Sequence, residues 1–427
     1  MEIVVKPSRL VGEVTAPPSK PYTHRALTAA LLSKGISRVS NPLRARDTNA
    51  TLHACRMLGA GVIEDQGGVD VMGGELKLPE DVLDVENSGT TLRIFTAVSA
   101  LTPEGYVILT GDESLRKRPM QPLLDALHRL GVECWSSRLN GCAPVIVKGG
   151  GVEGGEVRIR GDISSQFVSA LLFMAVGSRR GVSITVEGDP VSRPYIDATI
   201  ETLRRFRFRV EREGYRFFHV EGGQQGEATG FMVPGDFGSA SFLLAGAHLT
   251  GGEVRVNALS LELPQADAKI LDVLRAFGSR VEVGETWVRV KGAGGGGGGE
   301  FDLRDSPDLI PVVAVMASKS PEETLIKGVR HARFKESDRL ESTAAELRKL
   351  GVEVEVLPEE LRIRGRRKLG GGVTLDAHGD HRLFMALTIL SLATEQGCRV
   401  SGAEWVDVSY PEFLKHIKAL GARWKEA

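Results

Sequence analysis

A repeat of roughly 70 residues runs through the whole chain and restricts its fold more than any other feature. Each copy contains a helix that ends in leucine or an aromatic residue, then a glycine, then a strand. The six copies read CRMLGAGVI, LHRLGVECW, LRRFRFRVE, LRAFGSRVE, LRKLGVEVE and IKALGARWK. Glycine suits this place because it lacks a Cβ and can adopt the left-handed conformation that ends a helix. The glycines are Gly59, Gly131, Gly278, Gly351 and Gly421. The third copy has Arg207 instead, so we predict a strained or different cap there.

A second marker recurs with the same period: a polar turn that opens a very apolar helix. The six segments are SKPYTHRALTAALL from Ser19, NSGTTLRIFTAVSAL from Asn87, GDISSQFVSALLFMAV from Gly161, GDFGSASFLLAGA from Gly235, SPDLIPVVAVMA from Ser306 and HGDHRLFMALTILSLA from His378. Helices that are apolar on all sides should be buried, whereas the amphipathic LxxLG helices should lie outside them. Strands such as YVILTGD separate the two helix types, so the pattern predicts an α/β fold.

The two chain ends indicate how the repeats are divided. The sixth copy stops at ARWKEA, without the last strand of the other copies, and the N-terminal EIVVKPSRLVGEVTAP contains two strands with no helix before them. The simplest closure lets the N-terminus complete the last copy. This predicts one domain of residues 1–18 plus 235–427 and an inserted domain of residues 19–234, with three copies in each. Two crossings, near Pro17-Pro18 and Pro234-Gly235, would join them.

Composition excludes several classes of protein. A formal net charge of −1 gives no general attraction to nucleic acid or anionic membranes, which disfavours a DNA clamp built from repeats. No apolar run approaches the ~20 residues that span a bilayer. The four cysteines are scattered without a CxxC motif, as expected of reduced thiols in a cytoplasmic protein. The glycine run 294–299 is expected to be a flexible loop and not a phosphate-binding P-loop, because no Gly-Lys-Ser/Thr follows it.

Basic residues gather near the turns that open the apolar helices. They are Lys20, Arg25, Arg93, Arg118, Arg193, Lys335, Arg339 and Arg382. Helix N-termini attract anions, and arginine matches the geometry of carboxylate and phosphate groups. Helix capping would explain any one polar residue of these turns, and solvation would explain any one arginine. The joint pattern predicts a cleft for a small molecule with several negative charges.

Two acidic residues in the same turns are candidates for proton transfer. Asp308 opens an apolar helix, and Glu336 lies between Lys335 and Arg339. An acid/base pair needs carboxyl groups tuned by burial and neighbours, but a helix dipole and a simple ion-pair network explain the two residues equally well. A metal site at His378 and His381 ranks lower, because no third ligand is evident.

Taken together, these segments resemble the EPSP synthases, the 3-phosphoshikimate 1-carboxyvinyltransferases. The matching blocks run from end to end: SKPYTHRAL, NSGTTLR, GDESLRKRPM, GDISSQF, SRPYIDAT, GDFGSAS, SPDLIP, KESDRL, GDHR and SYPEF. The resemblance implies two inside-out α/β barrel domains of three βαβαββ repeats each, with the active site in the cleft between them. It implies transfer of the enolpyruvyl group of phosphoenolpyruvate to the 5-hydroxyl of shikimate 3-phosphate through a tetrahedral intermediate. It implies no metal or other cofactor, and we expect a cytoplasmic monomer.

The resemblance also assigns residues. Those for shikimate 3-phosphate are Lys20, Arg25, Ser164, Ser165, Gln166, Ser192, Tyr195, Asp308 and Lys335. Those for phosphoenolpyruvate are Lys20, Asn87, Gly89, Thr90, Arg118, Gln166, Arg339 and Arg382. The implied catalytic residues are Asp308, which orients and deprotonates the 5-hydroxyl, Glu336, which protonates the methylene carbon, and Lys20.

Three positions depart from the usual EPSP synthase pattern. Pro21 replaces a serine, Val408 replaces a lysine, and His331 replaces an asparagine. We expect the first two changes to weaken substrate binding. Two alternatives stay open: the sister enolpyruvyl transferase that acts on UDP-N-acetylglucosamine, and a binding protein of the same fold without turnover.

Overall fold

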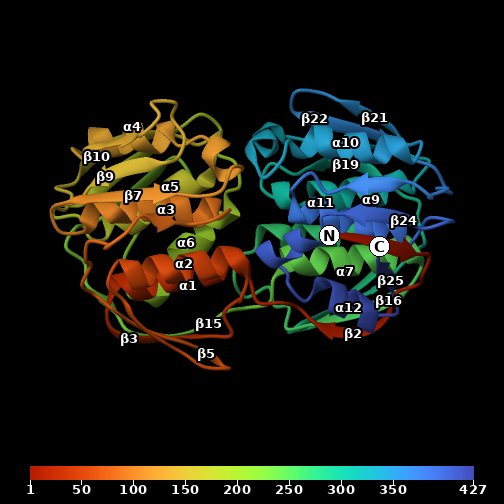
Figure 1. The fold of residues 1–427 in the computed structure, drawn as a ribbon, viewed down its shortest axis with the longest axis horizontal. Coiled ribbons are helices and arrows are strands. Elements are labelled where there is room, and N and C mark those ends of the chain that lie inside the picture. The colour runs from red at the N-terminus through yellow and green to blue at the C-terminus, as the bar shows by residue number, and fades with distance from the viewer. The chain divides into compact units, whose positions relative to one another are not determined.

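A computed structural model describes all residues, Met1–Ala427, and the chain divides into two compact units (Figure 1). The discontinuous unit contains Met1–Pro17 and Gly235–Ala427, and the inserted unit contains Pro18–Pro234. The chain therefore passes between the units after Pro17 and again after Pro234.

Each unit contains three inner helices that are almost completely buried, as the apolar runs predicted. They are α1 (Lys20–Leu32), α3 (Gly89–Val98) and α5 (Ser165–Ala175) in the inserted unit, and α7 (Phe237–Thr250), α9 (Ile310–Ser318) and α11 (His381–Ser391) in the discontinuous unit. In α7 every residue from Phe237 to Leu249 is buried. A helix without a polar face cannot expose one to solvent. Its buried position inside the unit therefore follows from its composition.

Six outer helices follow the inner ones in alternation and bury only one face. They are α2 (Arg46–Met57), α4 (Gln121–Arg129), α6 (Pro194–Arg205), α8 (Ile270–Ala276), α10 (Arg339–Lys349) and α12 (Phe413–Ala419). In α4, for example, Leu123, Leu124 and Leu127 are buried while Asp125 is exposed. The amphipathic pattern therefore predicted their position correctly. None of the twelve α-helices combines the length and the apolar character that a membrane span requires.

The ends of the outer helices follow the predicted rule. The five repeat glycines all have positive φ, from 77° at Gly351 to 103° at Gly59. Arg207, which follows the C-cap residue Phe206 of α6, has φ of 65°. The prediction of a strained cap in the third copy is confirmed, because a residue with a Cβ pays a steric cost in this conformation.

Six small sheets cover the inner helices, three in each unit. In the inserted unit they contain β15 (Gly230–Met232), β14 (Gly226–Glu227), β3 (Ser33–Ser40), β5 (Gly68–Gly73) and β4 (Gly61–Glu64); β6 (Leu83–Asp84), β7 (Tyr106–Thr110), β9 (Val145–Lys148) and β8 (Cys134–Ser136); and β10 (Gly155–Arg160), β11 (Val182–Glu187), β13 (Phe217–Val220) and β12 (Glu211–Glu213). In the discontinuous unit they contain β2 (Val11–Thr15), β16 (Glu253–Asn257), β18 (Trp287–Lys291) and β17 (Arg280–Val283); β19 (Gly299–Asp302), β20 (Glu323–Lys327), β22 (Glu360–Arg364) and β21 (Glu353–Val356); and β23 (Thr374–Asp376), β24 (Cys398–Ser401), β1 (Glu2–Lys6) and β25 (Arg423–Glu426).

The strand that follows each inner helix has a parallel neighbour on one side and an antiparallel neighbour on the other. In the second copy, for example, β7 runs parallel to β6 and antiparallel to β9, which also pairs with the edge strand β8. Together with the two helices, this arrangement makes each copy a βαβαββ unit, so the predicted α/β class is confirmed.

The N-terminal strands close two different copies. β1 pairs antiparallel with both β24 and β25, so it completes the sixth copy as predicted, and Figure 1 shows both chain ends in this sheet. β2 pairs instead with β16 of the fourth copy, which corrects the expectation that both strands join the last copy. The reason is the crossing of the chain: β15 precedes α7 in sequence but pairs with β3 in the inserted unit. The fourth copy therefore takes its parallel strand from the N-terminus.

Candidate functional site

In the inserted unit, a buried arginine closes over the first turn of α3. Arg118 Nη2 donates to Asn87 Oδ1 at 2.8 Å, and its Nη1 donates to the Asn87 carbonyl at 3.3 Å. Arg118 and Asn87 are each 6 % exposed. A Cβ on Gly89 would lie 3.1 Å from Arg118 Nη1, so glycine leaves room for the guanidinium at the helix start. Three residues assigned to phosphoenolpyruvate from the sequence therefore form one cluster.

The start of α5 is tied to the same turn of α3. Gln166 Nε2 donates to Thr90 Oγ1 at 2.9 Å, and Gln166 Oε1 accepts from Arg93 Nη1 at 2.5 Å. Ser164 is the N-cap of α5, and its hydroxyl accepts from the Gln166 backbone N–H at 3.3 Å. The next residue, Ser165, is buried. Hydrogen bonds of Gln166 thus tie the start of α5 to the first turns of α3.

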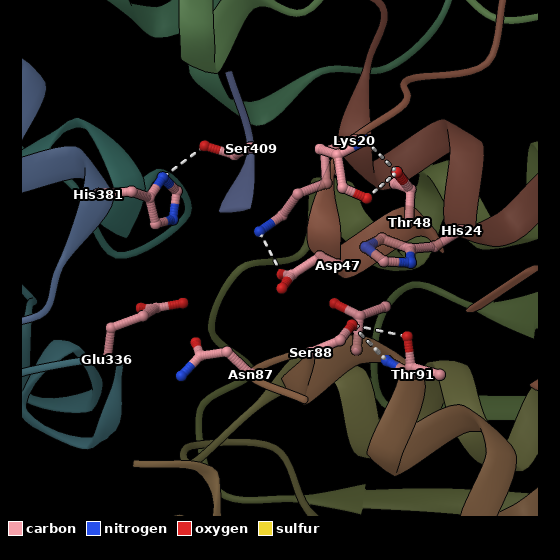
Figure 2. Close-up of polar contacts among 12 residues, drawn as sticks. Lys20, His24, Asp47, Thr48, Asn87, Ser88, Thr91, Glu336, His381 and Ser409 are labelled. Atoms are coloured by element: carbon pink, nitrogen blue, oxygen red, sulfur yellow. Dashed lines mark hydrogen bonds and ion pairs between the residues drawn. The ribbon is translucent and has the colours of Figure 1, made fainter. Parts of the chain in front are cut away.

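A lysine–aspartate ion pair marks the start of α1. Lys20 Nζ lies 2.7 Å from Asp47 Oδ2, with 13 % and 5 % of the side chains exposed (Figure 2). Asp47 belongs to the first turn of α2, and sequence reasoning missed it because an acid in a helix first turn is common. Pro21 fits the second position of α1, where its missing N–H costs no helical hydrogen bond.

Arg25 holds the segment that carries Ser192 and Tyr195. Its Nε donates to Thr199 Oγ1 at 2.9 Å and its Nη2 to the Tyr195 carbonyl at 3.0 Å. Burial lowers the pKa of this guanidinium to about 10, since its hydrogen-bond partners are neutral oxygens. Ser192 has φ of 54°, a conformation that residues other than glycine adopt at a cost and that often marks functional sites.

In the discontinuous unit, Arg339 connects three carboxylates. Its Nη1 lies 2.5 Å from Asp308, its Nη2 2.7 Å from Glu336, and its Nε 2.8 Å from Asp380. Only 1 % of the Arg339 side chain and none of Asp380 is exposed. Burial favours the neutral arginine, but Asp380, Glu336 and Asp308 together raise its pKa well above the ordinary value. Arg339 is therefore a permanent positive charge that brings the two candidate acid/base residues together.

Asp308 is held by a second arginine and by a lysine. Arg382 Nη2 lies 2.8 Å from Asp308 Oδ2, and Lys335 Nζ lies 3.9 Å from Oδ1. Burial would raise the pKa of Asp308, but Arg382, Lys335 and Arg339 outweigh it and lower the pKa well below the ordinary value. The structure thus gathers Asp308, Lys335, Glu336, Arg339 and Arg382 at the starts of α9, α10 and α11, as the repeat argument predicted.

The two histidines considered for a metal site have separate partners. His378 Nε2 lies 2.8 Å from Glu346 Oε1. His381 Nδ1 lies 2.5 Å from Ser409 Oγ (Figure 2). They do not converge, and no group of three side chains from His, Cys, Asp and Glu is arranged to hold a metal ion. The His378–Glu346 pair joins the turn before α11 to α10 and is part of the framework of this unit.

Comparison with known proteins identifies the family. The family model described as EPSP synthase (3-phosphoshikimate 1-carboxyvinyltransferase) matches residues 4–417. The 3-phosphoshikimate 1-carboxyvinyltransferases of Methanothermobacter thermautotrophicus and Korarchaeum cryptofilum are 45% and 46% identical to this chain, each over 98% of both chains. The chain belongs to the EPSP synthase family. An EPSP synthase structure from Acinetobacter baumannii has a TM-score of 0.82 at 25% identity and covers all of both chains. The enolpyruvyl transferase NikO from Streptomyces tendae, 18% identical with a TM-score of 0.81, has the same fold.

Two departures from the EPSP synthase pattern lie at buried positions. Val408 is 2 % exposed at the end of a 3₁₀ turn, directly before Ser409, which binds His381. His331 is 4 % exposed, and its burial, followed by the charge of Lys335, lowers its pKa to about 3. His331 is therefore neutral at physiological pH. The change from asparagine to histidine at this position exchanges one neutral polar side chain for another.

Sequence reasoning also missed Asp380, although a signal for it exists. An aspartate follows glycine directly before α7 and α11, at Asp236 and Asp380, and in both cases it caps the helix. The repeat therefore predicts Asp380 as a cap. Asp380 also binds Arg339, and this contact joins the sixth copy to the fifth. A sequence pattern within a single copy cannot predict a contact between two copies.

Proposed function

We propose that the polar clusters of the two units act on one pair of substrates in the reaction of the EPSP synthase family. A member of this family transfers the enolpyruvyl group of phosphoenolpyruvate to the 5-hydroxyl of shikimate 3-phosphate and releases phosphate. The observation that carries the proposal is one ion-pair cluster, in which Arg339, Arg382 and Lys335 meet at Asp308 and Arg339 also binds Glu336. Buried cations beside two carboxyl groups suit a reaction that needs both anion binding and proton transfer.

Phosphoenolpyruvate would be bound mainly by charge. Lys20, Arg118, Arg339 and Arg382 supply the cations for its phosphate and carboxylate, and arginine can bind either group through two parallel hydrogen bonds. The remaining phosphoenolpyruvate ligands are neutral groups at the starts of α3 and α5: Asn87, Gly89, Thr90 and Gln166. The cluster around Arg118 supports this assignment, because Asn87 and Gly89 shape the place of the guanidinium.

Shikimate 3-phosphate would be bound by hydroxyl groups and helix starts. Ser164, Ser165 and Ser192 would hold its 3-phosphate, an anion that suits the free N–H groups of a helix N-terminus. The remaining ligands are Lys20, Arg25, Gln166, Tyr195, Asp308 and Lys335. The bonds from Arg25 to the Tyr195 carbonyl and to Thr199 support a role for Arg25 in fixing the Ser192–Tyr195 segment.

The proton transfers would depend on an exchange of partners on the arginines. In the structure Arg382 and Arg339 both bind Asp308, which keeps that carboxylate a weak base. We infer that the anionic groups of phosphoenolpyruvate compete for these guanidinium groups. Asp308 then loses part of the positive field and becomes basic enough to take the proton of the 5-hydroxyl. The 5-oxygen would bond to C2 of phosphoenolpyruvate as protonated Glu336 gives its proton to the methylene carbon, and this forms the tetrahedral intermediate. In the elimination the bond from C2 to the phosphate oxygen would break, and the Glu336 carboxylate would take back one methyl proton.

Phosphate release with each substrate alone and with both tests this function. The proposal requires release only when shikimate 3-phosphate and phosphoenolpyruvate are both present. Release with UDP-N-acetylglucosamine in place of shikimate 3-phosphate would identify the sister enzyme instead. Saturable binding of shikimate 3-phosphate without release would identify a binding protein. We also expect a cytoplasmic monomer without a cofactor, and light scattering after gel filtration would measure the mass directly.

A further inference from the structure

A chain of buried side-chain hydrogen bonds joins α1, α2 and α3 of the inserted unit. His24 Nδ1 lies 2.6 Å from Thr51 Oγ1, Thr51 Oγ1 lies 2.6 Å from Thr91 Oγ1, and Thr91 Oγ1 lies 2.6 Å from Ser88 Oγ. Each of the four side chains is at most 1 % exposed. Figure 2 shows the end of the chain at Ser88 and Thr91, with His24 near the start of α1. The His24–Thr51 and Thr51–Thr91 bonds join three different helices, whereas Ser88 and Thr91 form the local N-cap of α3.

His24, the first residue of this hydrogen-bond chain, is neutral. Burial, and then the charges of Lys20 and Arg25 on the same helix, lower the pKa of His24 well below its ordinary value. His24 Nε2 is buried and has no hydrogen-bond partner. A buried N–H without a partner is rarer than an unused acceptor, so we place the proton on Nδ1. His24 then donates to Thr51, Thr51 to Thr91, and Thr91 to Ser88, and every hydroxyl hydrogen between the ends of the chain is used.

Each of the three helices joined by these hydrogen bonds also carries a candidate substrate ligand or its direct partner. In each helix that residue lies within one helical turn of the hydrogen-bonded residue. Lys20 precedes His24 by one turn of α1, and Asp47, which binds Lys20, precedes Thr51 by one turn of α2. Ser88 lies between Asn87, which binds Arg118, and Gly89. The chain therefore fixes the starts of three helices relative to one another, and these starts carry the candidate ligands of phosphoenolpyruvate.

We propose that His24, Thr51, Thr91 and Ser88 form a positioning relay that sets Lys20 against the Asn87–Gly89 turn for phosphoenolpyruvate; this inference rests on the proposed function. The four residues are positioning residues, because they act through Lys20, Asp47 and Asn87. Such a role has a kinetic consequence. A displacement of ~1 Å between binding groups can cost up to ~10²-fold in rate.

The test breaks the relay at its centre with an isosteric change. Thr51→Val removes the hydroxyl that both His24 and Thr91 contact, and Thr51→Ser restores it. The matched control is Thr96→Val, because Thr96 is fully buried on α3 and its hydroxyl bonds only the Leu92 carbonyl of its own helix, at 2.7 Å. Kinetic constants for both substrates and thermal unfolding are measured for each variant.

We expect Thr51→Val to raise the Michaelis constant for phosphoenolpyruvate about tenfold, with Thr51→Ser close to the unmodified protein and Thr96→Val within about twofold of it. Both valine variants should unfold at a lower temperature, since Thr51→Val loses the bonds to His24 and Thr91 and Thr96→Val loses the bond to the Leu92 carbonyl. Equal constants in Thr51→Val and Thr96→Val would overturn the relay while leaving the proposed function intact. No turnover by the unmodified protein would overturn both.

Discussion

The strained cap at Arg207 gives a prediction whose size follows from the backbone alone. Arg207 stands where five other copies have glycine, and its φ of 65° lies in the left-handed region. For a residue with a Cβ this conformation costs about 1–2 kcal/mol. Glycine avoids that cost but loses about 0.5–1 kcal/mol more conformational entropy on folding. Arg207→Gly should therefore stabilise the protein by about 0.5–1 kcal/mol.

The side chain of Arg207 contributes little that the change would lose. Its one ion pair, with Glu227, has a separation of 3.9 Å, and the two side chains are 73% and 74% exposed. Exposed pairs of this kind contribute ~0–1 kcal/mol at most. Arg207→Ala is the matched control, because it removes the same ion pair but keeps the Cβ and the strain.

Denaturation by urea, followed by circular dichroism, measures the difference between the two variants. Arg207→Gly should unfold at a higher midpoint than Arg207→Ala. The reverse change, Gly131→Ala, tests the same physics in the second copy. Gly131 has φ of 83°, and a Cβ there would meet no atom within 4 Å, so only backbone strain should destabilise that variant. An Arg207→Gly variant no more stable than Arg207→Ala would refute the reasoning.

Three further predictions concern the candidate site and the response to pH. Asp308→Asn and Glu336→Gln should each reduce turnover by ~10²-fold or more with substrate binding largely kept, and near-normal turnover in either would disprove that residue's role. Val408→Lys should lower the Michaelis constant for phosphoenolpyruvate, because it adds a cation where EPSP synthases usually carry one; an unchanged constant would contradict this. Burial, then Lys319, lowers the pKa of His248 to about 4, so the unfolded chain takes up a proton below pH ~6.5 before the folded protein does. Stability should fall as the pH drops from there toward 4, by up to about 2 kcal/mol at pH 5, and His248→Gln should lose less in urea unfolding at pH 7.5 and 5.0.

Local patterns in the sequence determined the elements and their depth in the fold. The apolar runs that became α7 and α9 have no polar face, so burial was their only stable state. The glycine after five of the six outer helices predicted a left-handed cap, and the sequence also showed the exception at Arg207. The sequence also predicted the candidate ligands, since most of them lie at helix starts marked by the repeat.

Tertiary structure alone decided which copies share their strands and which charges meet. The sequence could not assign β2 to the fourth copy, because the strand pattern of β2 fits more than one sheet. The assignment follows only from the tertiary structure, in which β15 pairs with β3 of the inserted unit and leaves the place beside β16 to β2. The i,i+3 spacing of Glu336 and Arg339 suggested their ion pair, but nothing in the sequence indicated that Arg339 would also bind Asp308 and Asp380, or that His24 would reach Thr51. Helix and strand patterns arise from neighbours a few residues apart. The contacts of Arg339 with Asp308 and Asp380, and of His24 with Thr51, join residues 27 to 41 positions apart and exist only once the copies pack.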